Sequence, residues 1–307
     1  MDLSIIIPIY NEEGNIHKLL DRLEGVIGKM NLNSYEYIFI NDGSRDKSME
    51  LIRELSKKNS NIHFINLSRN FGHQIAVTAG LDKSKGDAVV IIDADLQDPP
   101  ELIPELYQKL KSGFEVVYAK RKSRQGEGFM KKFTAKMFYR LLSYMTSISI
   151  PVDTGDFRIV DRKIVDVLKQ MPEQQKFLRG QISWIGFNQT FVEYDRDERF
   201  AGKTGYTYKK MIRLALDGIT SFSNFPLKIV TLAGFIVSGI SFFMILYALY
   251  SRFISKDYEP GWTSLMLTVL FLGGIQLIGI GIIGEYISRM SANLRNRPLY
   301  IIRESNL

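Results

Sequence analysis

The chain has 307 residues, a formal net charge of +7 and no cysteine. The lack of cysteine excludes disulfide bonds, thiolate catalysis and zinc sites built on cysteine. A basic protein can bind nucleic acid or an anionic lipid surface. Two uncharged apolar stretches near the C-terminus favour the lipid, so we expect a membrane partner and no nucleic acid.

The first 111 residues alternate short apolar runs with amphipathic stretches. The β-branched apolar runs predict strands, and the amphipathic stretches predict helices. The predicted strands span residues 3–9, 35–40, 62–66 and 88–92, and the helices after them end near residues 29, 58, 84 and 111. This alternation predicts an α/β domain with a mostly parallel sheet.

Polar side chains follow the predicted strands at their carboxyl ends, where open α/β sheets bind ligands. We therefore expect residues 10–12, 42–44 and 93–98 to be neighbours in space. Asp42 is placed to accept hydrogen bonds from a nucleotide base or ribose. An Asx-turn with Gly43 is the alternative, and the pattern leaves both open.

Two carboxylates separated by one residue, Asp93 and Asp95, follow the fourth predicted strand. Mg²⁺ and Mn²⁺ prefer oxygen ligands and bridge to phosphates, so we expect Asp95 to bind one of these ions together with Asp93 and Gln97. The pattern alone also fits ordinary turn or cap residues. The three histidines are far apart in the sequence, and we expect no histidine-rich metal site.

Residues 120–140 contain eight basic side chains and one acidic side chain, Glu127. From Phe129 to Met145, apolar residues recur at every fourth position. This pattern favours a helix over about 129–147 that lies in the membrane surface with its apolar side down. A helix that packs on the core with a solvated basic edge is the alternative. A second interface helix is expected over about 207–224.

Residues 229–250 and 263–284 are each free of charged side chains. A helix of this length spans roughly 33 Å, enough to cross the hydrocarbon core of a membrane. Basic side chains dominate before the first stretch and after the second. The positive-inside rule therefore places both termini in the cytoplasm and the connection near 254–262 outside. We expect a multi-pass protein of the inner or plasma membrane.

Several motifs occur together along the chain: Ser4-Ile-Ile-Ile-Pro-Ile-Tyr-Asn-Glu-Glu13, Asn41-Asp-Gly-Ser44, Asn70-Phe-Gly72, Asp93-Ala-Asp-Leu-Gln-Asp-Pro-Pro100, Thr154-Gly-Asp-Phe-Arg158, Phe177-Leu-Arg-Gly180 and Arg196-Asp-Glu-Arg-Phe-Ala-Gly-Lys-Thr-Gly-Tyr206. This set resembles the inverting, GT-A-type glycosyltransferases. More narrowly, it resembles the polyisoprenyl-phosphate glycosyltransferases related to dolichyl-phosphate mannose synthase, in their bacterial form with two C-terminal membrane spans.

The resemblance implies three parts. Residues 1–225 would form a cytoplasmic, Rossmann-like GT-A catalytic domain that includes both interface helices. Residues 226–288 would form two transmembrane helices, over about 229–251 and 263–285. Residues 289–307 would form a basic cytoplasmic tail.

The resemblance also implies roles for individual residues. The donor nucleotide would be held by Pro8, Tyr10, Asn11, Glu12, Asp42, Asp93 and Asp95, and the metal on its diphosphate by Asp93, Asp95 and Gln97. Phosphates of donor or acceptor would be bound by Lys120, Arg121, Arg179, Arg196, Arg199 and Lys203. Many relatives have a lysine where this chain has Gly205, and Lys203 is close enough to replace it.

Asp156 occupies the position usually assigned to the catalytic base, and the metal ligand Asp95 would share in catalysis. A lipid monophosphate is already mostly dianionic near pH 7, because its second pKa is about 6, so it hardly needs a base. We therefore expect Asp156 to orient sugar hydroxyls or an arginine and to stabilise positive charge at C1 of the sugar.

The expected reaction is transfer of one sugar, with inversion, from a nucleotide sugar to a polyprenyl phosphate. UDP and undecaprenyl phosphate are the preferred donor nucleotide and acceptor, and a separate flippase would take the product. The alternatives are a processive polysaccharide synthase and a catalytically degenerate membrane scaffold. Gly-x-x-x-Gly spacing in the second span fits either homo-oligomer contacts or packing between the two spans.

Overall fold

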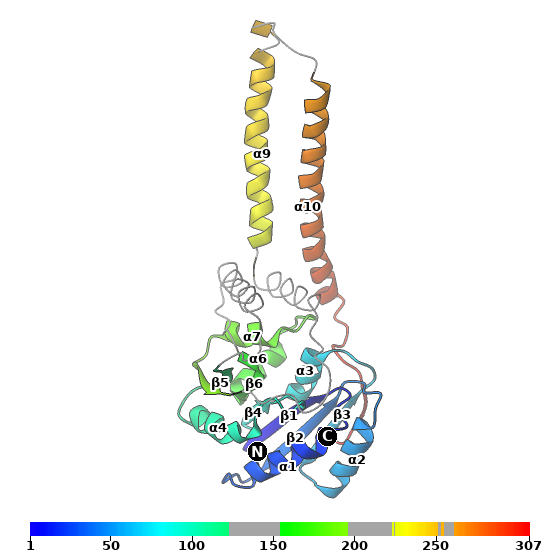
Figure 1. The fold of residues 1–307 in the computed structure, drawn as a ribbon, viewed down its shortest axis with the longest axis vertical. Coiled ribbons are helices and arrows are strands. Elements are labelled where there is room, and N and C mark those ends of the chain that lie inside the picture. Colours follow the sequence, from blue (N-terminus) through cyan, green and yellow to red (C-terminus); the bar gives the residue numbers. More distant parts are fainter. Residues whose placement is uncertain (123–153, 196–222, 224, 251–252, 255–260) are drawn as a thin grey trace.

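The computed structural model describes residues 1–122, 154–195, 223, 225–250, 253–254 and 261–307. It shows one sheet with helices on both faces and two long helices that project from this domain (Figure 1). The interface helices expected over 129–147 and 207–224 lie outside the described residues, apart from Ser223. So do Arg196, Arg199 and Lys203.

The N-terminal elements confirm the expected alternation of strands and helices. Each predicted strand agrees with the structure to within one residue at either end. The elements are β1 (Leu3–Ile9), α1 (Ile16–Ile27), β2 (Tyr35–Asn41), α2 (Ser48–Lys58), β3 (Ile62–Leu67), α3 (His73–Lys83), β4 (Ala88–Ile91), the 3₁₀ turn η1 (Pro100–Leu102) and α4 (Ile103–Lys111).

The remaining elements complete a mostly parallel sheet, as expected for the fold class. They are β5 (Val116–Arg121), β6 (Thr154–Asp161), α6 (Arg162–Gln170), α7 (Leu178–Ile185), β7 (Gln189–Tyr194), α9 (Phe225–Tyr250), α10 (Trp262–Leu294) and β8 (Ile302–Ser305). The strand order is β7-β5-β6-β4-β1-β2-β3-β8. Strand β6 runs antiparallel to β4, so the first residues of β6 lie beside the carboxyl end of β4.

The alternation of side chains along the strands divides the core into two layers. Helices α1, α2 and α4 pack on the face that carries Ile5 and Ile7. Helices α3, α6 and α7 pack on the face that carries Ile6, the face nearer the two long helices (Figure 1). Helix α3 lies close to the sheet because it has glycine at position 80, where a Cβ atom would come within 2.6 Å of Ile6 Cγ2.

Pro8 lies in β1, in the middle of the sheet, which is unusual for proline. The last bond between β1 and β4 runs from the Ile92 N–H to the Ile6 carbonyl, 3.1 Å away. Residues 6 and 8 point the same way along a strand, so Pro8 is the next residue whose N–H would face β4. Proline has no N–H, and the ladder stops there. The chain after Ile92 is therefore free to turn away from the sheet.

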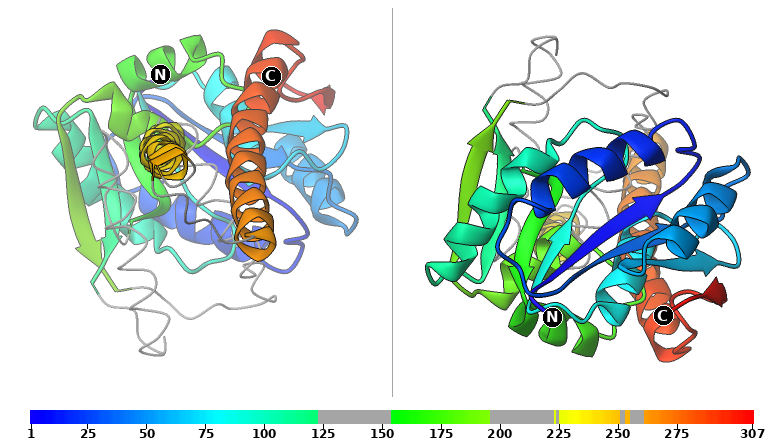
Figure 2. Two further views of the ribbon diagram at one scale, coloured as in Figure 1. Left: turned by 90° about the horizontal axis from the view of Figure 1, so that it is seen from above. Right: turned by 90° about the horizontal axis from the view of Figure 1, so that it is seen from below.

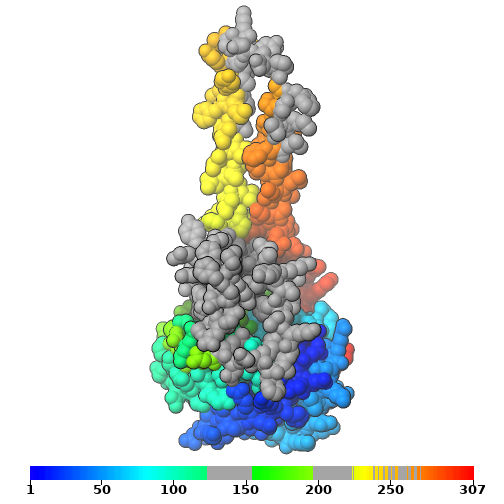
Figure 3. Space-filling view, in the orientation of Figure 1, coloured from blue at the N-terminus to red at the C-terminus, as the bar shows by residue number. Residues whose placement is uncertain are grey.

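Among the described residues, two segments are long and apolar enough to cross a membrane: Phe225–Met244 in α9 and Phe271–Leu294 in α10. The buried share is 0% for the first segment and 6% for the second, and many of their large apolar side chains are exposed. Both helices stand out from the sheet domain (Figure 3). Gly279 of α10 faces Val230 of α9, so at this position a small residue serves packing between the two helices. A homo-oligomer contact remains a prediction.

The C-terminal segment differs from the simple basic tail expected after residue 288. Helix α10 continues to Leu294, and the chain then returns to the sheet as β8. This strand pairs antiparallel with β3, with Ser305 opposite Ile65 (Figure 2). The sequence gives little sign of this strand, because Ile302–Ser305 is short and has two charged residues.

Replacement of Gly80 by alanine is expected to destabilise the domain. The new Cβ would lie 2.6 Å from Ile6 Cγ2 and 2.8 Å from Ile40 Cδ1, and overpacking of this kind costs about 1–3 kcal/mol. Gly25→Ala in α1 is the matched control, because nothing lies within 4 Å of its added Cβ. Thermal unfolding of the full chain in detergent should show a lower Tm for Gly80→Ala and an equal or higher Tm for Gly25→Ala. Equal effects would show that α3 has room to move.

Candidate functional site

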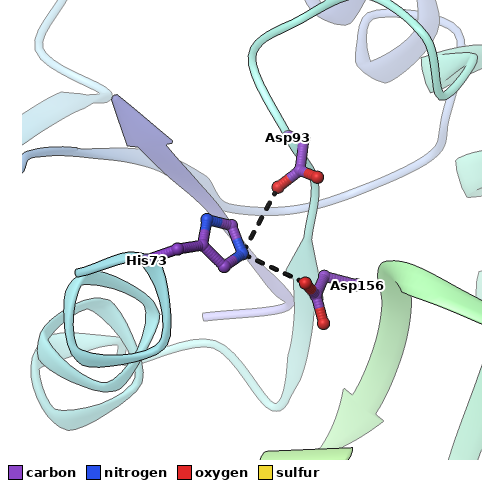
Figure 4. Close-up of side chains that lie close together, drawn as sticks. All are labelled: His73, Asp93 and Asp156. Atoms are coloured by element: carbon purple, nitrogen blue, oxygen red, sulfur yellow. Dashed lines mark ion pairs between the residues drawn. The ribbon is translucent and has the colours of Figure 1, made fainter. Parts of the chain in front are cut away.

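Three side chains from different elements converge at the carboxyl edge of the parallel strands (Figure 4). His73 begins α3, Asp93 follows β4, and Asp156 lies near the start of β6. The His73 Nε2 atom is 3.6 Å from Asp93 Oδ1 and 3.2 Å from Asp156 Oδ2. The antiparallel pairing of β4 with β6 brings Asp93 and Asp156 together, although they are far apart in the sequence.

Asp156 contacts three cationic groups. Besides its contact with His73, its Oδ1 accepts hydrogen bonds from Arg179 Nε at 2.9 Å and from Arg158 Nη2 at 3.1 Å. Burial raises the pKa of this carboxyl, but Arg179, His73 and Arg158 outweigh that effect and hold the pKa well below its usual range. Asp156 is therefore a carboxylate at neutral pH and a weak proton acceptor.

His73 and Asp93 both have raised pKa values. Burial lowers the pKa of His73, but the carboxylates of Asp93 and Asp156 raise it to about 9. Burial raises the pKa of Asp93 to about 6. Repulsion from Asp156, Asp98 and Asp95 adds to this increase, and the positive charge of His73 opposes it. At neutral pH in the absence of metal, His73 is therefore a cation that lies between two carboxylates.

The same three side chains fit a divalent cation. One ligand atom from each of His73, Asp93 and Asp156 lies within 4.8 Å of the other two. The Oδ1 atom of Asp93 is buried and has no hydrogen-bond partner, so it is available for a metal–oxygen contact. Binding of a metal through the histidine would require His73 to lose its proton, because only the neutral imidazole is a ligand.

We call residues 93–98 the acidic turn. Its other predicted metal ligands, Asp95 and Gln97, make different contacts from Asp93. Asp95 is buried, and its Oδ1 accepts the backbone N–H of Gln97 at 3.2 Å, as in an Asx-turn. Leu96 between them has φ of 61°, an uncommon conformation for a non-glycine residue that often marks a functional turn. Asp95 and Gln97 remain predicted metal ligands. The geometric cluster among the described residues contains His73 and Asp156 instead.

Asp98 and Tyr194 position Arg121 beside the acidic turn. Asp98 is fully buried and accepts a hydrogen bond from the Tyr194 hydroxyl. Arg121 Nη2 is 3.9 Å from Asp98 Oδ1. Neighbouring residues on a strand point to opposite faces, so Lys120 does not join this group. It pairs with Glu193 at 3.0 Å and lies over the Phe191 ring.

Asp42 holds the loop that leads to His73. Its carboxylate accepts the backbone N–H groups of Phe71 at 2.7 Å and Gly72 at 2.9 Å, and the side chain is buried. The next residue, Gly43, has φ of 69°, and a Cβ there would come within 2.6 Å of the backbone of residues 69 and 70. These contacts give Asp42 a structural role, and its contact with a nucleotide stays a prediction.

The loop after β1 is tied to the loop after β2. The Asn11 N–H donates to Ser44 Oγ at 3.0 Å, and the Glu12 N–H donates to Ser48 Oγ at 3.0 Å. Asn11 has φ of 57°, and Tyr10 is half exposed. The expected neighbourhood of residues 10–12 with residues 42–44 is thus present.

The structure brings together Asp93, Asp156 and Arg179 from the expected site and places Arg121 at its border. It also adds residues that the sequence analysis missed. Asp98 lies in the expected segment 93–98, whereas Arg158, although part of a quoted motif, and Tyr194 were given no role. For His73, the one available signal is its position directly after Asn70-Phe71-Gly72, a segment already expected to open a helix.

Comparison with known proteins gives two family matches. Residues 4–168 match glycosyl transferase family 2, and residues 225–290 match the GtrB C-terminal hairpin. The first match runs from β1 into α6, and the second covers α9 and most of α10. They agree with the GT-A-like fold and the C-terminal hairpin seen in the structure.

Similar proteins extend over nearly the whole chain. The uncharacterized glycosyltransferase YkcC of Bacillus subtilis is 52% identical over 98% of this chain and 93% of its own length. The SfII prophage-derived bactoprenol glucosyl transferase of Shigella flexneri is 40% identical over 100% of this chain and 99% of its own length. The prophage bactoprenol glucosyl transferase homolog of Escherichia coli K12 is 41% identical over 99% of this chain and 99% of its own length.

His73→Gln is expected to weaken Mn²⁺ binding by at least about tenfold, since even loss of a group that orients a ligand has an effect of that size. Affinity in the unaltered chain should rise between pH 6 and 9, because protons compete for Asp93 with a pKa of about 6 and for His73 with a pKa of about 9. Mn²⁺ titration followed by electron paramagnetic resonance measures both.

His17→Gln is the matched control, because His17 is exposed on α1 and does not belong to the cluster of His73, Asp93 and Asp156. Tighter Mn²⁺ binding by His73→Gln would contradict the ligand role. It would show that the protonated imidazole competes with the metal for the two carboxylates.

Proposed function

This chain belongs to glycosyltransferase family 2, and from that premise we propose that it transfers a single sugar from a nucleotide sugar to a polyprenyl phosphate at the membrane. The observation that carries the proposal is the pairing of Asp156 with His73 and Arg179 in a domain joined to an apolar hairpin. Relatives 40–41% identical over nearly their full length are named as bactoprenol glucosyl transferases or their homologues, which supports the acceptor.

The donor in this proposal is a UDP-sugar, and the acceptor is undecaprenyl phosphate. Loops 10–13 and 42–48, tied together beside β1 and β2, would receive the nucleoside, with half-exposed Tyr10 available for contact. Asp93 with His73 and Asp156, or with Asp95 and Gln97, would hold a divalent ion on the diphosphate. Such an ion would neutralise the charge that grows on the leaving group.

The proposed reaction brings an anionic acceptor to an anionic donor, and Coulomb repulsion opposes that approach. Arg121 and Arg179 offset the repulsion, because guanidinium groups bind phosphate oxygens in a bidentate manner. The acceptor oxygen would attack C1 from the face opposite the diphosphate and invert that centre. Asp156 would remain ionised throughout, keep Arg179 in place and stabilise positive charge near C1.

The proposal places the enzyme in the inner or plasma membrane with both termini in the cytoplasm. Strand β8 and strand β1 belong to the same sheet, so the residues before and after the hairpin must lie on one side of the membrane. The excess of basic residues flanking the hairpin supports the cytoplasm as that side. The lipid-linked sugar formed there then requires a separate flippase.

The proposed function is tested with the purified full chain, undecaprenyl phosphate in liposomes, Mg²⁺ or Mn²⁺, and a panel of UDP- and GDP-sugars. Lipid-extractable radiolabelled sugar and free nucleotide diphosphate are measured together. The Asp93→Asn/Asp95→Asn variant should lose at least about a hundredfold in rate, since metal stabilisation of the leaving group contributes several kcal/mol.

Asp21→Asn is the matched control, because Asp21 is exposed on α1. Undiminished synthesis by the double variant would contradict the metal-assisted mechanism. Release of no nucleotide from any donor by the unaltered chain would favour a membrane scaffold, and products with several sugars would favour a processive synthase.

Asp156→Asn is expected to lower kcat by about a hundredfold at every pH between 6 and 9. The pKa of Asp156 lies well below its usual range, so its protonation does not shape the rate profile in that interval. An effect of this size is typical for the loss of a group that stabilises transition-state charge. Asp166→Asn on the exposed side of α6 is the control. A loss confined to pH below about 6 would instead show proton removal by Asp156.

A further inference from the structure

Helix α10 is longer than a membrane span, and its last turns carry charged side chains. The helix has 33 residues, or roughly 50 Å, whereas the hydrocarbon core is about 30 Å thick. Glu285 and Arg289 form an ion pair at 3.0 Å near its end, where charged side chains require water or protein. We call residues 285–294 the α10 stalk.

The α10 stalk contacts the segment that leads into α7. Asn293 Oδ1 accepts the backbone N–H of Gln174 at 3.0 Å, and the Arg289 guanidinium donates to Gln175 Oε1. A few residues later, α7 begins at Leu178. Its second residue is Arg179, which donates to Asp156. The stalk therefore lies next to the element that supplies one cation of the Asp156 cluster.

The chain after the stalk contacts α3 at both ends. We call residues 300–306 the C-terminal strap. The Tyr300 hydroxyl donates to Asp82 at 2.9 Å, near the end of α3. Before the start of α3, Ser68 donates its N–H to the Ile301 carbonyl at 2.8 Å, and its carbonyl accepts from Arg303 at 3.0 Å. The strap therefore holds the helix that supplies His73, another cation of the cluster.

Helices α7 and α3 are also joined directly. The Leu178 N–H donates to the Gln74 side chain at 3.1 Å, and Gln74 follows His73. Both views in Figure 2 show the end of α10 and the terminal strand on the β3 side of the sheet domain. A continuous set of contacts thus runs from the stalk and the strap to the elements that carry His73 and Arg179, two of the three side chains that pair with Asp156.

We propose that the α10 stalk and the C-terminal strap position Arg179 and His73 on Asp156, with Asn293 and Tyr300 as positioning residues for sugar transfer. The proposal rests on the proposed function. Its physical basis is that catalysis requires charged groups held in one geometry, and a displacement of about 1 Å can cost about a hundredfold in rate. The membrane helix then does more than anchor the domain, because its inner end sets the geometry of the cluster.

The test compares Asn293→Ala, which removes the acceptor for Gln174, with Asn293→Asp, which keeps it. Ser291→Ala is the control, because Ser291 is exposed on the same stalk. Tyr300→Phe removes the bond to Asp82 alone. Each full-length variant is assayed in liposomes for kcat and for the KM of both substrates, and amide hydrogen exchange is followed in residues 68–76 and 174–182.

Asn293→Ala should lower kcat about tenfold, leave the KM of the nucleotide sugar within about twofold, and speed exchange in residues 174–182. Asn293→Asp should restore both properties. Tyr300→Phe should lower kcat and speed exchange in residues 68–76. Unchanged kcat in Asn293→Ala and Tyr300→Phe, or loss of activity that Asn293→Asp does not restore, would overturn the proposal.

The unaltered chain separates this proposal from the proposed function. If it transfers no sugar to any polyprenyl phosphate, the proposed function fails, and hydrogen exchange alone decides the positioning role. Unchanged exchange in both segments would then overturn it. Faster exchange in both segments of the respective variants would support it.

Discussion

The carboxylate of Asp156 and the three cations around it are the constraint on which the site depends. A buried charge is costly unless it is paired, and Asp156 is paired with His73, Arg158 and Arg179. Each partner comes from a different part of the chain, so the pairings require the relative positions of β6, α3 and α7. Arg158 lies beneath the carboxylate and is itself almost fully buried, which leaves its place on β6 fixed by the sheet.

The fold supplies those positions through backbone features. Pro8 ends the ladder between β1 and β4, and the chain beyond Ile92 turns so that Asp93 faces His73. Asp42 fixes the backbone before α3, and the glycine at position 80 lets α3 lie close to the sheet. The backbone geometry at Pro8, Asp42 and Gly80 therefore determines where the charged side chains meet.

The sequence predicts the N-terminal strands well because buried parallel strands are continuous β-branched runs, such as Leu3–Ile9. It also predicts that Asp93 and Asp156 belong to the site. It does not predict His73, because only the three-dimensional course of residues 68–72 carries that side chain to Asp93. Lys120 was expected to bind phosphate together with Arg121; in the structure it pairs with Glu193, and its phosphate contact stays a prediction. The pairing of Ile302–Ser305 with β3 depends on tertiary contacts that a four-residue charged segment does not reveal.

The pairing of β8 with β3 has a consequence for biosynthesis. Strand β8 follows both apolar helices in the chain, so it leaves the ribosome only after they have been made. Until then β3 is an open edge with unpaired backbone groups, and such edges promote aggregation. Translation stopped before Ile302 would thus yield a hairpin-bearing protein whose sheet lacks β8.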